Sequence, residues 1–353
     1  MSKITVPSKQ TALFLDGLQG NLTLGATNIL TPGPGQLLLK VKATALNPVD
    51  WKSQKHGILY NTFPAILGTD AAGDVVAIGE GVTKFKIGDQ VFCQGRFTKE
   101  YATFQEYTLA DEWHLAKIPT NISYDQAATI PLCLATAFVG MYNVIPYGIG
   151  LVNPTTPTGQ GHYKGIPFVV LGGASSVGQF AIQLAKLSGF SPIITTASLK
   201  HTSFLQSLGA TYVLDRNTPT SALKSQIAEI TDNKSIQYIY DSISSSETQK
   251  TGIEILSPGG NLIVVSSPSV TSQDKRVTYV FALRSLDQNV ELIKGVYAVL
   301  EEWLEKGVIQ PNKVDLLPGG LAGIVEGLRK MEQNQVSGVK LVVRPEETPE
   351  NAK

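Results

Sequence analysis

Two kinds of hydrophobic pattern divide the chain. Up to about residue 125, short runs alternate apolar and polar positions and are separated by Gly and Pro turn signals. Alternation with period two is typical of strands that bury one face. This region therefore predicts a partly open β-barrel or a folded sheet, on the evidence of four runs: "GQLLLKVKATAL", "GDVVAIG", "KIGDQVF" and "FQEYTLA".

The period changes to a helical one at Tyr124, with Ser123 as a plausible N-cap and a single helix expected to end before Pro146. About 20 residues rich in Pro, Gly and Thr follow, and a loop of this length is often functional or disordered. Strands then alternate with helices: 168–172, helix 177–188, "PIITTA", helix 199–208, "TYVLD", helix 219–230, "IQYIYDSI", helix 247–256 and "NLIVVSS".

Such alternation is typical of βαβ units, so the fold class is α/β with a doubly wound parallel sheet covered on both faces. Two further helices, near 288–306 and 319–333, precede a strand "KLVVRP" that returns the chain to the first domain. We therefore expect a β-rich domain from residues 1–127 and 288–353, and a doubly wound domain from residues 128–287.

Length and charge narrow the classes of function. A chain of 353 residues is long for one hydrophobic core, so we expect two domains. Lys plus Arg equals Asp plus Glu at 29 each, which gives no global charge for binding nucleic acid. No secretory signal or membrane span is evident, so we expect a cytoplasmic protein without a membrane partner. Two cysteines and four scattered histidines provide neither a disulfide framework nor a metal cluster.

The stretch "VVLGGASSVG" (169–178) runs from an apolar strand through a glycine-rich turn into a helix. In dinucleotide-binding turns three glycines allow the bend, the approach of the pyrophosphate and the close packing of the helix. Here the three positions are Gly173, Ser175 and Gly178, with Gly172, Ser176 and Val177 in the same turn. The hydroxyl of Ser175 could donate to a phosphate at the helix N-terminus. The alternative is an ordinary βα turn.

The residues after the second strand indicate which cofactor is preferred. An NAD site would carry Asp or Glu there for the ribose 2′-hydroxyl. This chain has Ser198 and Lys200, with His201 as a further candidate, which suit the 2′-phosphate of NADPH. Arg216, after the third strand, could add a second cation, or be a solvated surface charge.

With these motifs in place, the chain resembles the medium-chain dehydrogenase/reductase superfamily over nearly its whole length. The resemblance rests on "ALNPVDWK", "LGTDAAGDVVAIGEGVTKFKIGDQVF", "AATIPLCLATA", the glycine turn and "SGVKLVV". It implies a GroES-like catalytic domain beside a Rossmann domain. The zinc alcohol dehydrogenases of the superfamily have Cys and His at the positions of Asn47 and Thr69, and they carry a four-cysteine lobe that is absent here. Neither zinc site is expected.

Within the zinc-independent, quinone oxidoreductase-like branch, the chain most resembles the fungal trans-acting enoyl reductases that serve polyketide synthases. The motif "NPVDWK", the turn that carries Ser175, the Pro-rich insert and "SGVKLVVRP" support this assignment. The resemblance implies that Lys52, Asn47 and Thr136 are catalytic, and that Asn47, Pro48, Asp50 and Thr136 contact the cofactor. The alternatives are a surface loop lysine for Lys52, a helix residue bonded to its own backbone for Thr136, and a turn cap for Asp50.

Three further cofactor contacts complete the expected site. Ser266 follows the strand "NLIVVS", at the carboxyl edge where such folds bind ligands. Ser337 and Gly338 in "VSGVK" are candidates by resemblance.

Hydride transfer to an activated C=C creates an enolate, which a metal-free enzyme must stabilise with donors or a cation. In keeping with this chemistry, the resemblance to the trans-acting enoyl reductases favours an NADPH-dependent reductase of α,β-unsaturated thioesters, small or carrier-bound, with a polyketide synthase as the expected partner. Two alternatives stay open. A reductase of quinones and small enones would turn over free acceptors, and a non-catalytic NADPH-binding protein would bind the cofactor without hydride transfer.

Overall fold

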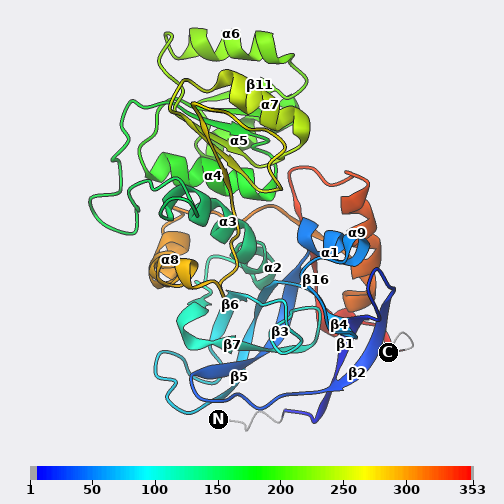
Figure 1. Cartoon of the computed structure of the whole chain (residues 1–353). Helices are drawn as coiled ribbons and strands as arrows, with labels where there is room; N and C mark the ends of the chain where they lie inside the picture. The colour runs from blue at the N-terminus through cyan, green and yellow to red at the C-terminus, as the bar shows by residue number, and fades with distance from the viewer. Residues whose placement is uncertain (1–5, 351–353) are drawn as a thin grey trace. The chain divides into compact units, whose positions relative to one another are not determined.

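The computed structural model describes residues 6–350, which form two compact units (Figure 1). Unit 1 is built from the chain up to and including Leu132, from Leu300–Glu305 and from the chain that starts at Pro311. Unit 2 comprises Cys133–Val299 and Lys306–Gln310. Helix α8 (Asp287–Glu305), which the sequence placed in the β-rich domain, contributes to both units.

Unit 2 contains a six-stranded sheet in the order β11-β10-β9-β12-β13-β14, in which every neighbouring pair is parallel. This order places the first strand beside the fourth, which is the Rossmann arrangement with its switch point between β9 and β12. The predicted α/β doubly wound fold is confirmed. The strands are β9 (Phe168–Leu171), β10 (Ile193–Ala197), β11 (Tyr212–Asp215), β12 (Tyr238–Asp241), β13 (Asn261–Val264) and β14 (Arg276–Tyr279).

Helices lie against both faces of this sheet. On one face Leu223 and Ile227 of α6 and Ile255 of α7 pack with Val169 and Leu171 of β9 in one buried cluster. Helix α4 packs against β9, β10 and β12, and it is amphipathic. The helices that follow the strands are α4 (Ser176–Leu187), α5 (Thr202–Leu208), α6 (Thr220–Ile230) and α7 (Ser246–Ile255).

The Pro-rich insert before β9 contains no helix or strand between residues 143 and 167. Tyr163 anchors it, because its ring stacks on Phe190 with centroids 4.5 Å apart and its hydroxyl accepts the N–H of Val152 at 2.7 Å. Phe190 also contacts Phe168, the first residue of β9. The insert is therefore held at the amino edge of the sheet, opposite to the edge where Rossmann folds bind ligands.

Unit 1 holds two sheets. The smaller has the order β2-β1-β4, from β1 (Lys9–Leu15), β2 (Leu22–Asn28) and β4 (Ala65–Ile66). The larger has the order β15-β16-β3-β5-β6-β8, with β7 also paired to β3. The β-rich, GroES-like prediction is confirmed by these strands: β3 (Gln36–Ala45), β5 (Asp70–Ile78), β6 (Gln90–Gln94), β7 (Tyr107–Asp111), β8 (Ala116–Lys117), β15 (Val314–Leu316) and β16 (Lys340–Val343).

The helices near the domain boundary differ from the prediction. Ser123 is an N-cap, as expected, and its side chain accepts the N–H of Gln126 at 3.3 Å. The single helix predicted from Tyr124 is wrong: α2 (Tyr124–Ala128) ends before Pro131, and α3 (Pro131–Tyr142) starts there. A proline disfavours helical geometry in the residue before it, and it fits the first turn of a new helix.

Three strands of unit 1 bring polar residues to one end of the larger sheet. Ala45, at the end of β3, pairs with Asp70 on β5 and with Val342 on β16. Because both pairings are antiparallel, the same register sets Lys340 opposite Asn47, two residues farther on. Asn47, Asp70 and Lys340 therefore meet, although they are far apart in the sequence.

No helix in the part of the chain between residues 6 and 350 is long and apolar enough to cross a membrane. Over the same residues, no three His, Cys, Asp or Glu side chains are grouped so that they could hold a metal ion.

Candidate functional site

The glycine turn joins β9 to α4 at the switch point of unit 2. Ser175 is the N-cap of α4, with φ −68° and ψ 156°, and its side-chain oxygen accepts the N–H of Gly178 at 3.0 Å. The first turn of α4, which begins with Ser176 and Val177, is the positive end of the helix dipole. The turn is therefore suited to hold a phosphate.

Steric contacts explain why glycine is needed on either side of Ser175. A Cβ on Gly173 would lie 2.1 Å from Thr195 Oγ1, and one on Gly178 would lie 2.5 Å from the carbonyl oxygen of Gly172. Gly172 has φ +82°, and a Cβ there would meet the side chain of Ile243 at 2.3 Å. A side chain at any of these positions would collide with atoms that already pack against the turn, so the turn requires glycine there.

Residues that follow β12 support the turn, and the sequence did not single them out. The hydroxyl of Ser242 donates to the carbonyl oxygens of Leu171 at 2.7 Å and Gly172 at 2.9 Å. The carboxylate of Asp241 is buried and accepts the N–H groups of Ile243 and Ser244. Burial raises the pKa of Asp241. These contacts join the carboxyl ends of β9 and β12, where the switch point lies.

The predicted residues for the 2′-phosphate gather at the next strand ends. Ser198 directly follows β10, and Arg216 directly follows β11. The N–H of Arg216 donates to the carbonyl oxygen of Ala197 at 3.0 Å, which holds the two strand ends together. Lys200 and Arg216 are exposed, and Ser198 and His201 are half-buried. The edge thus presents two cations to solvent and has no acidic residue directly after β10.

Ser266 lies two residues beyond β13 and is half-buried. The preceding residue, Val265, donates its N–H to Ser244 Oγ at 2.8 Å, which ties the end of β13 to that of β12. Thr136 belongs to α3, and its carbonyl oxygen accepts the hydroxyl of Tyr240 at 2.9 Å. Both residues lie in unit 2, with the turn and the cations.

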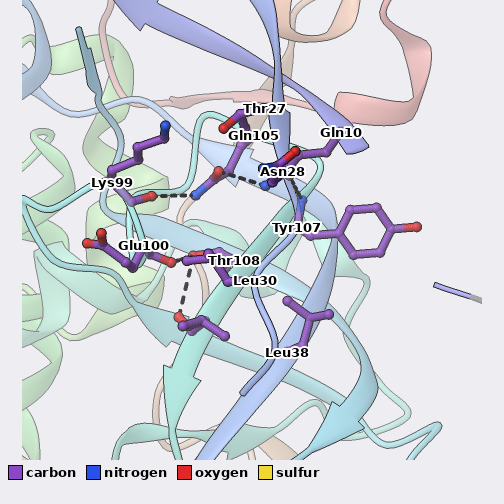
Figure 2. A pocket seen from close by; sticks show the side chains of 11 residues that line it. Gln10, Thr27, Asn28, Leu30, Leu38, Lys99, Glu100, Gln105, Tyr107 and Thr108 are labelled. Carbon is purple, nitrogen blue, oxygen red and sulfur yellow. Dashed lines mark hydrogen bonds between the residues drawn. The ribbon is translucent and has the colours of Figure 1, made fainter. Parts of the chain in front are cut away.

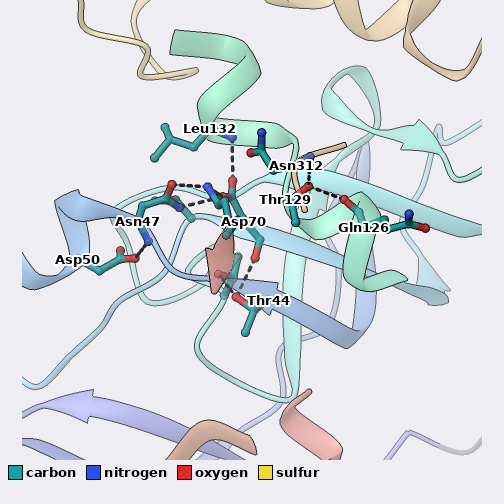
Figure 3. A network of polar contacts seen from close by, with 11 residues as sticks. Thr44, Asn47, Asp50, Asp70, Gln126, Thr129, Leu132 and Asn312 are labelled. Atoms are coloured by element: carbon teal, nitrogen blue, oxygen red, sulfur yellow. Dashed lines mark hydrogen bonds and ion pairs between the residues drawn. The ribbon is translucent and has the colours of Figure 1, made fainter. Parts of the chain in front are cut away.

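The candidate residues of unit 1 are centred on a buried network around Asn47 (Figure 3). The side-chain oxygen of Asn47 accepts from the ammonium of Lys340 at 2.6 Å, and its amide nitrogen donates to Asp70 Oδ2 at 2.8 Å and to Thr69 Oγ1 at 3.3 Å. Lys340 also forms an ion pair with Asp70 at 2.9 Å. The other oxygen of Asp70 accepts the N–H of Leu132 at 2.7 Å. Each of the four polar residues is at most 3% exposed.

Asn47 and Asp50 also fix the start of helix α1 (Pro48–His56). Pro48 is the first helical residue, which keeps Asn47 extended at φ −128° and ψ 153°. The carboxylate of Asp50 accepts the N–H of Asn47 at 2.7 Å, so the proposed capping role of Asp50 is confirmed. Burial, opposed by this hydrogen bond, raises the pKa of Asp50 to about 7.

Lys52 is in the second turn of α1, so the alternative of a loop lysine is wrong. Its side chain is half-buried and its Nζ lies 5.8 Å from the centre of the Trp51 ring. Burial lowers the pKa of Lys52. Ser337 is exposed, and Gly338 is buried with φ +75°, just before β16 and Lys340.

The residues at the positions of zinc ligands in the alcohol dehydrogenases do not fit a zinc ion. Asn47 and Thr69 offer an amide and a hydroxyl, whereas zinc prefers thiolate and imidazole. The ammonium of Lys340 lies against the oxygen of Asn47, and its positive charge would oppose a cation there.

A separate pocket of about 210 Å³ lies in unit 1 between β1, β2, β3 and β7 (Figure 2). The amide of Gln10 donates to Gln105 at 3.0 Å, and Gln105 donates to the carbonyl oxygens of Lys99 and Ala102. These side-chain amides thus have hydrogen-bond partners within the protein, and none of the candidate residues lines the pocket.

Lys340 and Asp70 are the members of the unit 1 network that sequence reasoning missed. A lysine that opens an apolar strand, in "VKLVV", is the signal that could have found the first, because a buried ammonium needs a buried partner. The partner itself follows only from the register of β3, β5 and β16.

Family models match both parts of the chain. Residues 33–120 match the alcohol dehydrogenase GroES-like domain, and residues 176–303 match a family described as zinc-binding dehydrogenase. The trans-enoyl reductase grgB of a Penicillium species is 30% identical, over 90% of this chain and 93% of its own length. The trans-enoyl reductase himH of Aspergillus japonicus is 32% identical, over 92% of this chain and 93% of its own.

Solved structures share the fold at lower identity. An alcohol dehydrogenase superfamily protein from Novosphingobium aromaticivorans has a TM-score of 0.79 at 23% identity, covering 95% of this chain and 99% of its own. The JamJ enoyl reductase in its apo form has a TM-score of 0.75 at 22% identity, covering 95% and 99%. The crotonyl-CoA carboxylase/reductase AntE in complex with NADP has a TM-score of 0.74 at 18% identity, covering 98% and 96%.

The two family models lead to the same assignment as the folds of the two units. The two relatives, each aligned over at least 90% of this chain, agree with it. The chain is an oxidoreductase and belongs to the medium-chain dehydrogenase/reductase superfamily, with fungal trans-enoyl reductases among its relatives.

Proposed function

We propose that this oxidoreductase uses NADPH to reduce the C=C bond of an α,β-unsaturated thioester, without zinc. The observation that carries the proposal is the bonding of Asn47, whose amide is held by Lys340 and Asp70 at a place where zinc enzymes of the superfamily have a metal ligand. Without a Lewis acid, the acceptor must form an anion that hydrogen bonds can stabilise, and the enolate of a thioester is such an anion. The names of the relatives support the same reaction.

The residues of unit 2 fit NADPH. Gly172, Gly173 and Gly178 allow the tight turn that leads into α4, and the first turn of α4 and the Ser175 hydroxyl would supply donors to a pyrophosphate. Lys200, Arg216 and Ser198 would hold the 2′-phosphate, with Ser266 and Thr136 as further contacts. NADP is bound in one of the solved structures that share the fold. When bound, the nicotinamide supplies the hydride.

In unit 1, we propose that Lys52 stabilises the enolate. The proposed cofactor contacts of this unit are Asn47, Pro48, Ser337 and Gly338. The lowered pKa of Lys52 makes its ammonium a better proton donor than an exposed lysine, because burial disfavours the charged form. Lys52 can thus stabilise the oxyanion with a charged hydrogen bond. Asp50 holds the start of the helix that carries it.

We also propose that the natural thioester is bound to the carrier domain of a polyketide synthase, as the resemblance to trans-acting enoyl reductases implies. Thioesters of N-acetylcysteamine, coenzyme A and a holo-carrier protein with the same enoyl group test this proposal. A kcat/KM that rises towards the carrier-bound form supports it, and equal values contradict it.

The test of the reaction is the oxidation of NADPH with a panel of acceptors: crotonyl and longer 2-alkyl enoyl thioesters, simple enones and a benzoquinone, with NADH as the control. Turnover of thioesters with NADPH alone supports the proposal, and Lys52→Ala should then reduce kcat. Turnover of the quinone alone would assign the chain to the quinone reductases. NADPH binding without turnover of any acceptor, including the carrier-bound one, would indicate a non-catalytic binding protein.

A further inference from the structure

Lys340 is a buried cation with a defined set of partners. Its side chain is 2% exposed, and its ammonium lies 2.9 Å from Asp70 Oδ2 and 2.6 Å from Asn47 Oδ1. Burial removes water from both charges of the pair, and this desolvation can cost as much free energy as their attraction provides. The pair is therefore expected to have a role other than stabilising the fold. The contact with Asn47 indicates where that role lies.

The ammonium determines how the amide of Asn47 is oriented. An ammonium only donates, so it must face the amide oxygen, and a carboxylate only accepts, so Asp70 must face the amide nitrogen. The two charges together leave one orientation for Asn47. A rotation of the amide by 180° would set NH₂ against the ammonium and oxygen against the carboxylate.

Asn47 in turn fixes the start of α1. The residue is the N-cap of the helix, and its N–H donates to Asp50. Helix α1 has nine residues, too few for a stable helix without tertiary contacts and caps. Lys52 is in its second turn, so a shift at Asn47 would be passed on to the ammonium of Lys52.

We propose that Lys340 is a positioning residue that fixes the start of helix α1, and with it Lys52, by holding the side-chain oxygen of Asn47. The inference rests on the proposed function only through the role of Lys52. The positioning itself concerns the fold of unit 1 and can be measured without a substrate.

The variant K340M/D70N removes both charges of the pair in the full-length protein, so neither is left buried without its partner. Amide hydrogen exchange, followed by mass spectrometry, is expected to become faster in residues 48–56 and to remain unchanged in unit 2. With an enoyl thioester, kcat should fall by roughly 10- to 100-fold, because a small displacement of a catalytic group has this effect.

R344M/D125N is the matched control. It removes another ion pair of unit 1, between Asp125 and Arg344 at 2.7 Å, together with the pair of Arg344 and Glu347 at 3.0 Å; Arg344 directly follows β16. This variant should leave both the exchange of α1 and kcat as in the wild type. N47A is the second test, because it keeps the Lys340–Asp70 pair and removes only the side chain through which Lys340 acts.

Faster exchange of α1 in K340M/D70N and N47A, but not in the control, supports the proposal. Wild-type exchange of α1 in either variant overturns it, whatever the kinetics show. If K340M/D70N does not fold, N47A decides alone. If the wild-type protein reduces no acceptor, the proposed function fails, but the exchange data still decide whether Lys340 positions α1.

Discussion

The hydroxyl oxygen of Ser175 accepts the backbone N–H of Gly178 at 3.0 Å. The serine at the middle position of the glycine turn is therefore the N-cap of helix α4, which the sequence did not predict. Because a hydroxyl can accept and donate hydrogen bonds at the same time, the Ser175 hydroxyl can still donate a hydrogen bond to a phosphate. One side chain can thus stabilise the helix and bind the cofactor.

Two substitutions at Ser175 separate these roles. Ser175→Ala removes the cap and should lower the free energy of unfolding by about 1 kcal/mol, whereas Ser175→Gly should lower it by only a few tenths. Both remove the donor, so both should weaken NADPH binding by roughly tenfold, the value of one hydrogen bond to a charged group. Thermal unfolding and calorimetric titration measure the two effects. Unchanged NADPH affinity in both variants would show that the hydroxyl does not contact the cofactor.

Gly173→Ala tests the steric requirement of the turn. The new Cβ would lie 2.1 Å from Thr195 Oγ1 and 2.9 Å from Ile182 Cδ1, both in buried side chains. We expect a loss of about 1–3 kcal/mol in the stability of unit 2, as for other overpacked sites, and weaker NADPH binding. Circular dichroism during urea unfolding and NADPH titration measure these changes. Gly17→Ala, with no atom within 4 Å of its Cβ, is the control and should change neither.

The double variant K200A/R216A tests the preference for NADPH. Each cation can donate a charged hydrogen bond to the 2′-phosphate, worth roughly tenfold in binding. The Kd for NADPH should therefore rise on the order of 100-fold, and the Kd for NADH should not change, because NADH lacks this phosphate. Lys224→Ala, at an exposed lysine of α6, is the matched control. An equal loss of affinity for both cofactors would contradict the assignment of these cations.

The pKa of Asp50 predicts a pH dependence of the stability of unit 1. Burial raises this pKa to about 7 in the folded protein, whereas an unfolded aspartate has a pKa of about 3.9. Between these two pH values, Asp50 is protonated in the folded state and ionised in the unfolded state. The stability that the protonated Asp50 contributes is therefore fully present below pH 4 and is lost as the pH rises through 7. Asp50→Asn stays neutral, so its stability relative to the wild type should increase by about 2 kcal/mol from pH 5 to 7.

All three tryptophans, Trp51, Trp113 and Trp303, belong to unit 1, so tryptophan fluorescence during urea unfolding reports this unit. The measurement is made at pH 5, 6, 7 and 8 for both proteins. A difference between Asp50→Asn and the wild type that is constant over this range would show that Asp50 does not titrate there.

Local patterns predicted unit 2 well. Alternating apolar strands and amphipathic helices, such as "FVVL" before "SVGQFAIQLAKL", depend on neighbouring residues, which a sequence displays directly. The strand β14 (Arg276–Tyr279) was not predicted, because "RVTY" has few apolar residues and pairs only as an edge strand next to β13. Helix α1 was not predicted either, since "PVDWKSQKH" has no apolar stripe and depends on Asn47 and Asp50 for its start.

The site in unit 1 shows what local patterns cannot predict. Asn47 and Lys340 are almost 300 residues apart in the sequence, and their contact follows from the antiparallel pairing of β3 with β16. Sequence reasoning identified Asn47 by its resemblance to a family position, but it could not identify the charges that orient it. The cap formed by Ser175 was missed for a different reason, since the same serine also fits a phosphate site.

The measurement that tests the central claim most directly follows the hydride itself. The full-length protein is incubated with NADPH that carries deuterium at both hydrogen positions of C4 and with a crotonyl thioester, and the product is analysed by mass spectrometry and NMR. The account predicts a saturated thioester with one deuterium at the β-carbon and a solvent proton at the α-carbon. Deuterium at the carbonyl carbon, in an aldehyde or alcohol product, would contradict the account, as would a saturated product without deuterium.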